Sequence, residues 1–238
     1  MENKIQQFKQ LVNKCDNIVF FGGAGVSTES GISDFRSKDG LYNQQYKYPP
    51  ETILSHTFFM NKTEEFFKFY KLKMNSLKYQ PNITHIKLSE LEARGKLKAV
   101  ITQNIDGLHQ KAGSKVVYEL HGSVLRNYCM NCNKFYDAEY VFNSKGIPRC
   151  SCGGIIKPDV VLYEEGLDEE TIENSIYAIQ KADLLIVAGT SLTVQPASGL
   201  INFFRGRNLV LINRDSTPYD NKANLVINDS LGKVFSNL

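Results

Sequence analysis

The chain has 238 residues, 42% of them hydrophobic and 22% charged, and its 28 basic and 25 acidic residues give a net charge of +3. These values are typical of a soluble globular protein and exclude the basic footprint of a nucleic-acid-binding domain. No apolar run approaches the ~20 residues of a membrane-spanning helix, and charges run through the N-terminal segment where a signal peptide would be apolar. We therefore expect a cytoplasmic protein without nucleic-acid or membrane partners.

The first part of the chain predicts a helix, a strand and a glycine turn. Residues 2–14 have helical spacing, with an apolar face made of Ile5, Phe8, Leu11 and Val12. Residues 18–21 form a continuous apolar run, typical of a parallel strand buried on both faces. A turn follows at Gly22, Gly23 and Gly25, and then residues compatible with a helix. A strand, a glycine turn and a helix in this order expose backbone N–H groups that can hold a phosphate.

Residues 38–82 differ from the rest in composition. The stretch 37–51 is polar, aromatic and punctuated by proline, which predicts a loop. Residues 57–77 predict a helix dense in aromatic side chains, which form either core or the floor of an apolar pocket. An amphipathic helix over residues 83–94 is expected to end at Gly95.

The remaining chain alternates between short apolar strands and helical stretches. The expected strands cover residues 98–102, 116–120, 183–188, 208–212 and 225–227. This alternation predicts an α/β fold with a Rossmann-like, doubly wound parallel sheet. Polar or glycine residues follow most of these strands, and the carboxyl ends of parallel strands form the crevice where such sheets bind ligands.

His121 directly follows the strand expected over residues 116–120 and precedes a glycine. A lone histidine is more often structural than catalytic, whereas this position is where a site residue would lie. Its position therefore leaves the two roles equally open.

Four of the five cysteines lie close together in the sequence, in the pattern C-x2-C, 17 residues, C-x-C. In a reducing compartment such a cluster indicates metal before disulfides. Four thiolates match one closed, structural zinc site, whose ligands would be Cys129, Cys132, Cys150 and Cys152. A nucleic-acid-binding zinc ribbon is the competing interpretation, but Lys134 and Arg149 are too few to form a basic face.

The glycine turn does not predict an ordinary dehydrogenase. Read as G-x-G-x-x-G from Gly23, the third glycine position is occupied by Thr28. The acidic residue that would hold the ribose hydroxyls about 20 residues later is also missing, because residues 43–47 lie in a polar loop. A dinucleotide can bind here, but without the layout for hydride transfer.

Five segments together resemble the sirtuin family of NAD-dependent protein deacylases, in a bacterial-type form. They are GAGVSTESGISDFRS (23–37), TQNIDGLHQKAG (102–113), ELHGS (119–123), the four-cysteine module and GTSLTVQPA (189–197). The expected organisation is a Rossmann-like NAD-binding domain, a cofactor loop with a helical insert and a zinc-binding module. These correspond to residues 1–37, 83–123 and 155–238, to residues 38–82, and to residues 124–154, respectively.

The resemblance implies that the protein deacetylates acetyl-lysine in protein or peptide substrates at the expense of NAD. The acetyl oxygen attacks the ribose C1′ as nicotinamide leaves, and the products are lysine, nicotinamide and O-acetyl-ADP-ribose. His121 is then the general base and Asn104 a second catalytic residue. Mono-ADP-ribosyl transfer and a non-enzymatic NAD-binding scaffold remain the alternatives. We expect a monomer.

The resemblance also implies the binding residues. Those expected to contact NAD are Gly23, Ala24, Gly25, Thr28, Asp34, Phe35, Arg36, Gln103, Asn104, Ile105, Asp106, His121, Gly189, Thr190, Ser191, Asn213, Arg214, Ser230 and Leu231. The substrate peptide is expected beside Val160, Val161, Leu162, Tyr163 and Val194.

Departures from the family pattern carry expectations of their own. Ser33 replaces a common proline, which is expected to loosen the cofactor loop, and Glu164 replaces a glycine, which is expected to favour basic peptide flanks. Family members that remove succinyl groups use a tyrosine and an arginine where this chain has Phe67 and Tyr70. Without the cation an acidic acyl group would be buried unpaired, so we expect no efficient desuccinylation.

Overall fold

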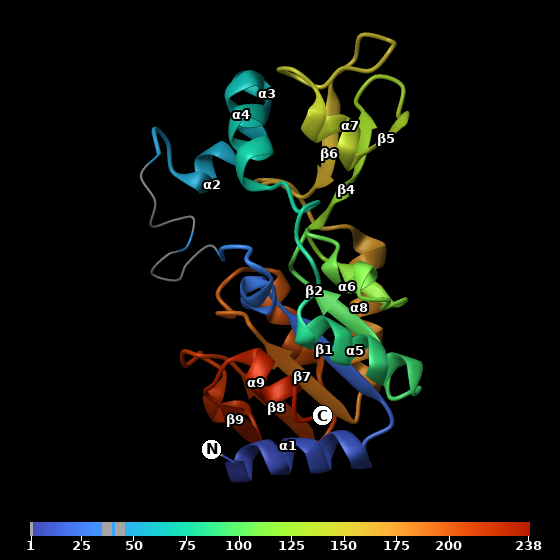
Figure 1. The fold of residues 1–238 in the computed structure, drawn as a ribbon, viewed down its shortest axis with the longest axis vertical. Coiled ribbons are helices and arrows are strands. Elements are labelled where there is room, and N and C mark those ends of the chain that lie inside the picture. Colours follow the sequence, from blue (N-terminus) through green and yellow to red (C-terminus); the bar gives the residue numbers. More distant parts are fainter. Residues whose placement is uncertain (1, 35–39, 41–45) are drawn as a thin grey trace.

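The computed structural model describes residues 2–34, 40 and 46–238, and Figure 1 shows two units, one above the other. The larger unit contains a sheet of six parallel strands in the order β3-β2-β1-β7-β8-β9. These strands are β1 (Ile18–Gly22), β2 (Leu97–Thr102), β3 (Val117–Glu119), β7 (Leu184–Ala188), β8 (Asn208–Ile212) and β9 (Leu225–Ile227). The chain forms β1, β2 and β3 in turn toward one edge of the sheet, and then β7, β8 and β9 in turn toward the other edge. This order is that of a doubly wound sheet, so the predicted fold class is confirmed.

Both faces of the sheet are covered, as the continuous apolar runs predict. Ile18 and Phe20 of β1 pack with one set of helices, namely α1 (Glu2–Lys14), α5 (Ile83–Ala93) and α9 (Leu231–Phe235). Val19 and Phe21 pack on the opposite face against α8 (Glu169–Lys181) and the 3₁₀ segment η4 (Ala197–Phe203). The alternation of side chains along one strand therefore supplies two separate cores.

The ends of α5 are fixed by its own sequence. Asn82 caps the helix by accepting a hydrogen bond from the Thr84 N–H at 3.0 Å. At the other end Gly95 adopts φ +72°, and the Lys96 N–H bonds to the Leu91 carbonyl at 3.0 Å, which ends the helix as expected. The Asn82 amide nitrogen also donates to the Val26 carbonyl at 2.8 Å, so the helix cap supports the glycine turn.

The smaller unit joins an antiparallel sheet to a helical insert (Figure 1). Its sheet consists of β4 (Gly122–Cys129), β5 (Phe135–Asp137) and β6 (Ile156–Val160), and α7 (Ala138–Asn143) packs on β4. The insert contains α2 (Pro50–Ile53), α3 (His56–Asn61) and α4 (Thr63–Lys73). Tyr70 of α4 stacks on Phe142 of α7 at a ring distance of 5.5 Å, and Lys71 Nζ bonds to the Gly146 carbonyl at 2.7 Å. Insert and zinc-module region therefore share one core.

Two predicted helices differ from the structure. The helix expected over residues 57–77 is two helices, α3 and α4, because Lys62 between them has φ −135° and ψ 47°. The helix expected after the glycine turn is wrong: two 3₁₀ turns, η1 (Ala24–Val26) and η2 (Thr28–Ser30), lie there. Gly31 at φ +93° ends them, since its N–H already closes a short turn on the Thr28 carbonyl.

A single-turn helix, α6 (Leu108–Lys111), follows β2, and a further 3₁₀ turn, η5 (Asp220–Lys222), precedes β9.

Among the described residues, none of the helices combines the length and apolarity needed to cross a bilayer.

Candidate functional site

A cavity of about 670 Å³ lies at the carboxyl edge of the main sheet, between the sheet and the smaller unit. Most of the predicted NAD-binding residues line it: Ala24, Gly25, Thr28, Asp34, Gln103, Asn104, Ile105, Asp106, His121, Gly189, Thr190, Ser191, Asn213, Arg214 and Leu231. Gly23 and Ser230 lie outside this lining, and Phe35 and Arg36 fall outside the described residues. Every predicted peptide-binding residue, from Val160 to Tyr163 and Val194, also lines the cavity.

The glycine turn packs tightly against the turn that follows β7. A Cβ on Gly25 would lie 2.8 Å from the Gly189 Cα, and one on Gly23 would lie 2.8 Å from the Thr190 Cβ. The Gly25 N–H also bonds to the Gly189 carbonyl at 2.8 Å. Any side chain at these positions would push the two strand ends apart. The glycines therefore allow the two turns to meet, and Gly25 and Gly189 line the cavity there without side chains.

A hydrogen-bonded chain connects the glycine turn with the loop after β2. Ser27 Oγ donates to Asp106 Oδ2 at 2.6 Å, and Asn104 Nδ2 donates to Ser27 Oγ at 3.1 Å. The Leu108 N–H bonds to the other Asp106 oxygen at 2.9 Å. Because its amide nitrogen is engaged by Ser27, the orientation of Asn104 is fixed. Burial raises the pKa of Asp106, while the hydrogen bonds from Ser27, Leu108 and Asn104 oppose that rise.

Ser27 is the main site residue that the sequence did not identify. It is 1% exposed and lies two residues after Gly25, inside the motif used for the family resemblance. Ser76 is another, since its hydroxyl donates to the Asp106 carbonyl at 2.9 Å from the segment after α4. The position of Ser27 beside a phosphate-type turn was an available signal. Nothing in the local sequence connects Ser76 with Asp106.

The geometry of His121 identifies the ring nitrogen that is free to act as a base. His121 Nδ1 lies 2.8 Å from the Gln103 carbonyl oxygen. A carbonyl only accepts hydrogen bonds, so Nδ1 carries the hydrogen and Nε2 carries the lone pair. Burial lowers the pKa of His121 below its usual 6.5, and the Gln103 carbonyl partly offsets that effect. The imidazole is therefore neutral at neutral pH, as a general base must be.

The far end of the cavity is formed by the turns after β7 and β8. The Thr190 N–H donates to Asn213 Oδ1 at 2.9 Å, and Gln103 Nε2 reaches Thr190 Oγ1 at 3.3 Å. Glu29 Oε1 accepts a hydrogen bond from the Gly232 N–H at 3.1 Å, which ties α9 to the glycine turn. The segments that follow three strands, β2, β7 and β8, therefore meet around one site.

The segment after β6 lies between the base and the helical insert. The Val161 N–H bonds to the His121 carbonyl at 3.0 Å, and the Tyr163 N–H bonds to the Leu54 carbonyl at 3.0 Å. Glu164 adopts φ +77°, and its Oε2 accepts from the Thr57 N–H at 2.9 Å. One carboxylate oxygen of Glu164 therefore accepts an intramolecular hydrogen bond at the start of α3.

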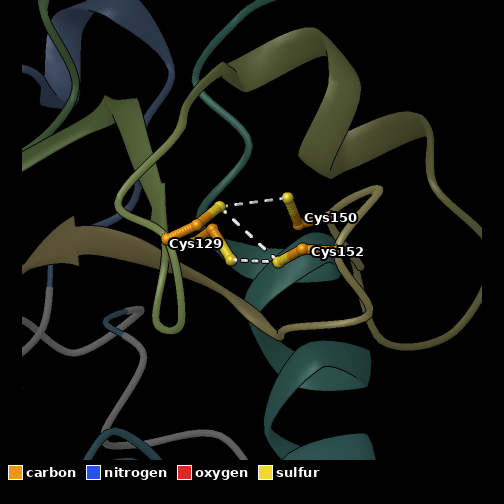
Figure 2. Close-up of side chains that lie close together, drawn as sticks. Cys129, Cys150 and Cys152 are labelled. Carbon is orange, nitrogen blue, oxygen red and sulfur yellow. Dashed lines mark hydrogen bonds between the residues drawn. The ribbon is translucent and has the colours of Figure 1, made fainter.

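The four clustered cysteines converge on one point. Their Sγ atoms lie within 4.8 Å of one another, and Figure 2 shows Cys129, Cys150 and Cys152 with their sulfur atoms turned together. Cys129 and Cys152 are 3.4 Å apart and Cys132 and Cys150 3.6 Å, close to the ~3.8 Å between sulfurs of a tetrahedral zinc site with ~2.3 Å bonds. Gly153 at φ +85° lets the shorter C-x-C pair turn back. The donor set fits one zinc ion.

The doubly wound sheet, the glycine turn at its centre and the cavity at its carboxyl edge define the class of Rossmann-like dinucleotide-binding proteins. Comparison with known protein families identifies the family within this class. The model of the Sir2 family matches residues 23–196. The chain therefore belongs to the Sir2 family, and the predicted sirtuin resemblance is confirmed.

Curated relatives and solved structures agree with this assignment. The chain is 61% identical to an NAD-dependent protein deacetylase of Clostridium perfringens, with 98% of each chain covered. It is 61% identical to one of Clostridium acetobutylicum, covering 98% of this chain and 96% of that one. A Sir2 complex with a deacetylated p53 peptide and 3′-O-acetyl ADP ribose matches with a TM-score of 0.90 and 38% identity, over 98% of this chain and 96% of that chain. A Sir2 complex with a p53 peptide and NAD+ matches with a TM-score of 0.86 and 38% identity, over 98% and 95%.

Proposed function

We propose that this protein is an NAD-dependent protein lysine deacetylase that transfers the acetyl group of acetyl-lysine to ADP-ribose and releases nicotinamide. The observation that carries the proposal is the neutral His121, held through Nδ1 in the same cavity as the glycine turn. The names of the relatives and the ligands of the similar structures support it. The product that carries the acetyl group is O-acetyl-ADP-ribose.

Different residues along the cavity are assigned to different parts of NAD. The turn at Gly23–Gly25 with Thr28 is assigned to the pyrophosphate, because Ala24, Gly25 and Thr28 line the cavity and the glycines leave this wall without side chains. Asn104 and Asp106 act at the nicotinamide end, together with Gln103 and Ile105. The adenosine end is assigned to Gly189, Thr190, Ser191, Asn213, Arg214, Ser230 and Leu231. Asp34, Phe35 and Arg36 complete the cofactor contacts.

In the reaction, the chain positions groups and moves a proton. Once nicotinamide has left and the acetyl oxygen has bonded to the ribose C1′, His121 Nε2 would accept a proton from a ribose hydroxyl, so that this oxygen can bond to the acyl carbon. The bond between that carbon and the lysine nitrogen then breaks, lysine leaves, and one water molecule completes O-acetyl-ADP-ribose. The peptide is placed by Val160–Tyr163 and Val194, which line the cavity next to this base. Main-chain pairing with such a segment binds peptides with little demand on sequence.

The four cysteines hold one structural zinc ion. With four sulfur ligands the tetrahedral shell is complete, so the ion has no open position for substrate. We also propose the division into an NAD-binding domain (1–37, 83–123 and 155–238), an insert with the cofactor loop (38–82) and a zinc module (124–154). We further propose that the enzyme is monomeric and cytoplasmic, without nucleic-acid or membrane partners. The reducing cytoplasm disfavours disulfides, so the cysteine thiolates are free to bind metal.

The test is NAD-dependent release of nicotinamide from an acetylated lysine peptide. With NAD labelled in its adenosine, we expect the label in free O-acetyl-ADP-ribose. Label on the protein substrate would show mono-ADP-ribosyl transfer instead. Binding of NAD without any turnover would show a scaffold.

Succinylated peptides are expected to be poor substrates. Phe67 and Tyr70 are neutral and fully buried, so a succinyl carboxylate placed near them would be desolvated without a positive charge to offset its own. We expect kcat/KM for a succinylated peptide to be at least ~100-fold below that for the acetylated peptide of the same sequence. Comparable turnover would contradict this and would point to Lys73, which also lines the cavity, as the acyl-binding cation.

Arg126 is expected to set the distance between the base and the peptide segment. Its Nη1 bonds to Glu119 Oε2 at 2.6 Å, two residues before His121, and its Nε bonds to Asp159 Oδ2 at 2.7 Å, just before Val160. We expect Arg126→Met to lower kcat/KM for acetylated peptide about tenfold, mainly through KM, with NAD affinity unchanged. Arg94→Met, in an exposed pair with Glu90 at the end of α5, is the control and should have no effect.

A further inference from the structure

The peptide segment, residues 160–163, is followed by a carboxylate that bonds back onto it. Glu165 Oε2 accepts a hydrogen bond from the Leu162 N–H at 2.9 Å, and the Glu165 N–H donates to the Leu162 carbonyl at 3.0 Å. Both backbone groups of Leu162 are therefore bonded to the same residue. Since each group can only turn away by losing its bond, Glu165 fixes the path of the backbone at Leu162.

The same carboxylate connects the peptide segment to two other elements. Glu165 Oε2 also accepts a hydrogen bond from Lys157 Nζ on β6 at 3.1 Å, and Lys157 Nζ donates to the Val160 carbonyl at 3.1 Å. The other oxygen, Glu165 Oε1, lies 2.8 Å from His56 Nδ1 at the start of α3. The charged group of Glu165 therefore joins the peptide segment to the sheet of the smaller unit and to the helical insert.

The surroundings strengthen the ion pair between Lys157 and Glu165. Their side chains are 23% and 21% exposed. By comparison, the side chains of Lys68 and Glu64, an ion pair on the surface of α4, are 70% and 64% exposed. Solvent and salt screen the less exposed pair less. Burial raises the pKa of Glu165, but the hydrogen bonds and positive charge of its partners together hold that pKa below its usual value, so the carboxylate is ionised at neutral pH.

We infer that Glu165 is a positioning residue for deacylation, which holds the peptide segment in the shape that receives the substrate peptide. This inference rests on the proposed deacylase function and adds a residue to it. Near its other end, the segment is attached to the base, because the Val161 N–H bonds to the His121 carbonyl at 3.0 Å. Loss of the Glu165 carboxylate leaves this contact in place but frees the backbone at Leu162. The effect should therefore appear as weaker peptide binding rather than as slower chemistry.

Two substitutions separate the hydrogen bonds of Glu165 from its charge. Glu165→Met keeps the length of the side chain and removes all three of its bonds, so we expect KM for an acetylated peptide to rise about tenfold, as the loss of a charge-assisted hydrogen bond allows. Glu165→Gln keeps an oxygen that can accept from Leu162 and Lys157, so KM should rise only about threefold. In both variants kcat and NAD affinity should stay within about twofold, because none of the three partners is assigned to NAD.

The experiment uses one acetylated peptide and three measurements. Nicotinamide release at saturating NAD gives kcat and KM, and direct binding to the NAD-free protein gives the affinity for the peptide. Hydrogen exchange of the Leu162 amide reports its bond to Glu165 without any turnover, and it should be at least about tenfold faster in Glu165→Met. The matched control is Glu64→Met, which breaks the exposed ion pair with Lys68 in the same unit and should leave all three measurements unchanged.

A rise in KM that is about tenfold in Glu165→Met, about threefold in Glu165→Gln and absent in Glu64→Met supports the inference. An unchanged KM in Glu165→Met overturns it, and so does a joint fall of kcat, NAD affinity and melting temperature in Glu165→Gln, which would show a general structural role. Where Glu165→Met does not fold, the change in KM of Glu165→Gln decides. If the wild type releases no nicotinamide, the proposed deacylase function has failed. Peptide affinity that falls only in the Glu165 variants would then still support the positioning role, and unchanged affinity would overturn it.

Discussion

Replacing His121 with alanine is expected to lower the deacetylation rate by between ~10²-fold and ~10⁴-fold, the range that one general base supplies. His121 Nδ1 is committed to the Gln103 carbonyl, so Nε2 is the atom that takes the proton. Most of the proposed NAD contacts lie in the glycine turn and in the turns after β7 and β8, which do not contact this ring. NAD affinity, measured by calorimetry, is therefore expected to stay within about threefold of the wild type.

The control for this variant is chemical rescue. The lost ring leaves space beside the Gln103 carbonyl, and added imidazole is expected to restore part of the rate without changing NAD affinity. Deacetylation that persists undiminished in His121→Ala would show that another group is the base. A parallel loss of NAD binding would show that the ring holds the cofactor.

The pH dependence follows from the same side chain. Burial lowers the pKa of His121 below 6.5, so the neutral, active form persists to lower pH than for a free histidine. The acid limb of kcat/KM is therefore expected to have its midpoint below 6.5. The folded state also binds this proton less readily than the unfolded state, so stability is lost as the pH falls below 6.5. A midpoint above 6.5 would contradict the assignment of His121 as the base.

The fold was largely predictable because its strands are buried on both faces. Asn208–Ile212 and Leu225–Ile227 are strands with the predicted bounds, since continuous apolar runs bounded by polar residues leave few alternatives. The break at Lys62 was not predictable, because the residues around it are compatible with a helix, whereas Lys62 itself has φ −135° and ψ 47°. The 3₁₀ turns after Gly23 depend in the same way on contacts with Gly189 and Asn82.

The site was predictable only in part, for a related reason. Residues at strand ends, such as Asn104 and His121, follow from topology, because all carboxyl ends of a parallel sheet meet at one edge. The connections between them join segments far apart in the chain. Ser27 with Asp106 and Arg126 with Asp159 are pairs of this kind. No local spacing or periodicity indicates such a pair, so the structure was needed to find them.

Removing the zinc is expected to unfold the smaller unit and to lower deacetylation at least ~50-fold. Cys129 and Cys150 are buried in the same core as Tyr70, Phe142 and Val160, so the metal holds together the surface against which the peptide lies. A structural zinc site of this type contributes ~10–16 kcal/mol of binding free energy, more than a small unit can lose and stay folded. Chelation, or Cys129→Ser, should therefore abolish peptide binding.

The matched control is Cys15→Ser, which changes a cysteine in the core of the main sheet, far along the chain from the metal ligands. This variant should keep one zinc per chain by metal analysis and nearly full activity. The main sheet has its own two cores and no zinc ligand, so zinc-free protein is expected to keep NAD binding while losing peptide binding. Re-added zinc should restore activity. Full activity in zinc-free protein would contradict the structural role, because the peptide segment would then be held without the core that packs against it.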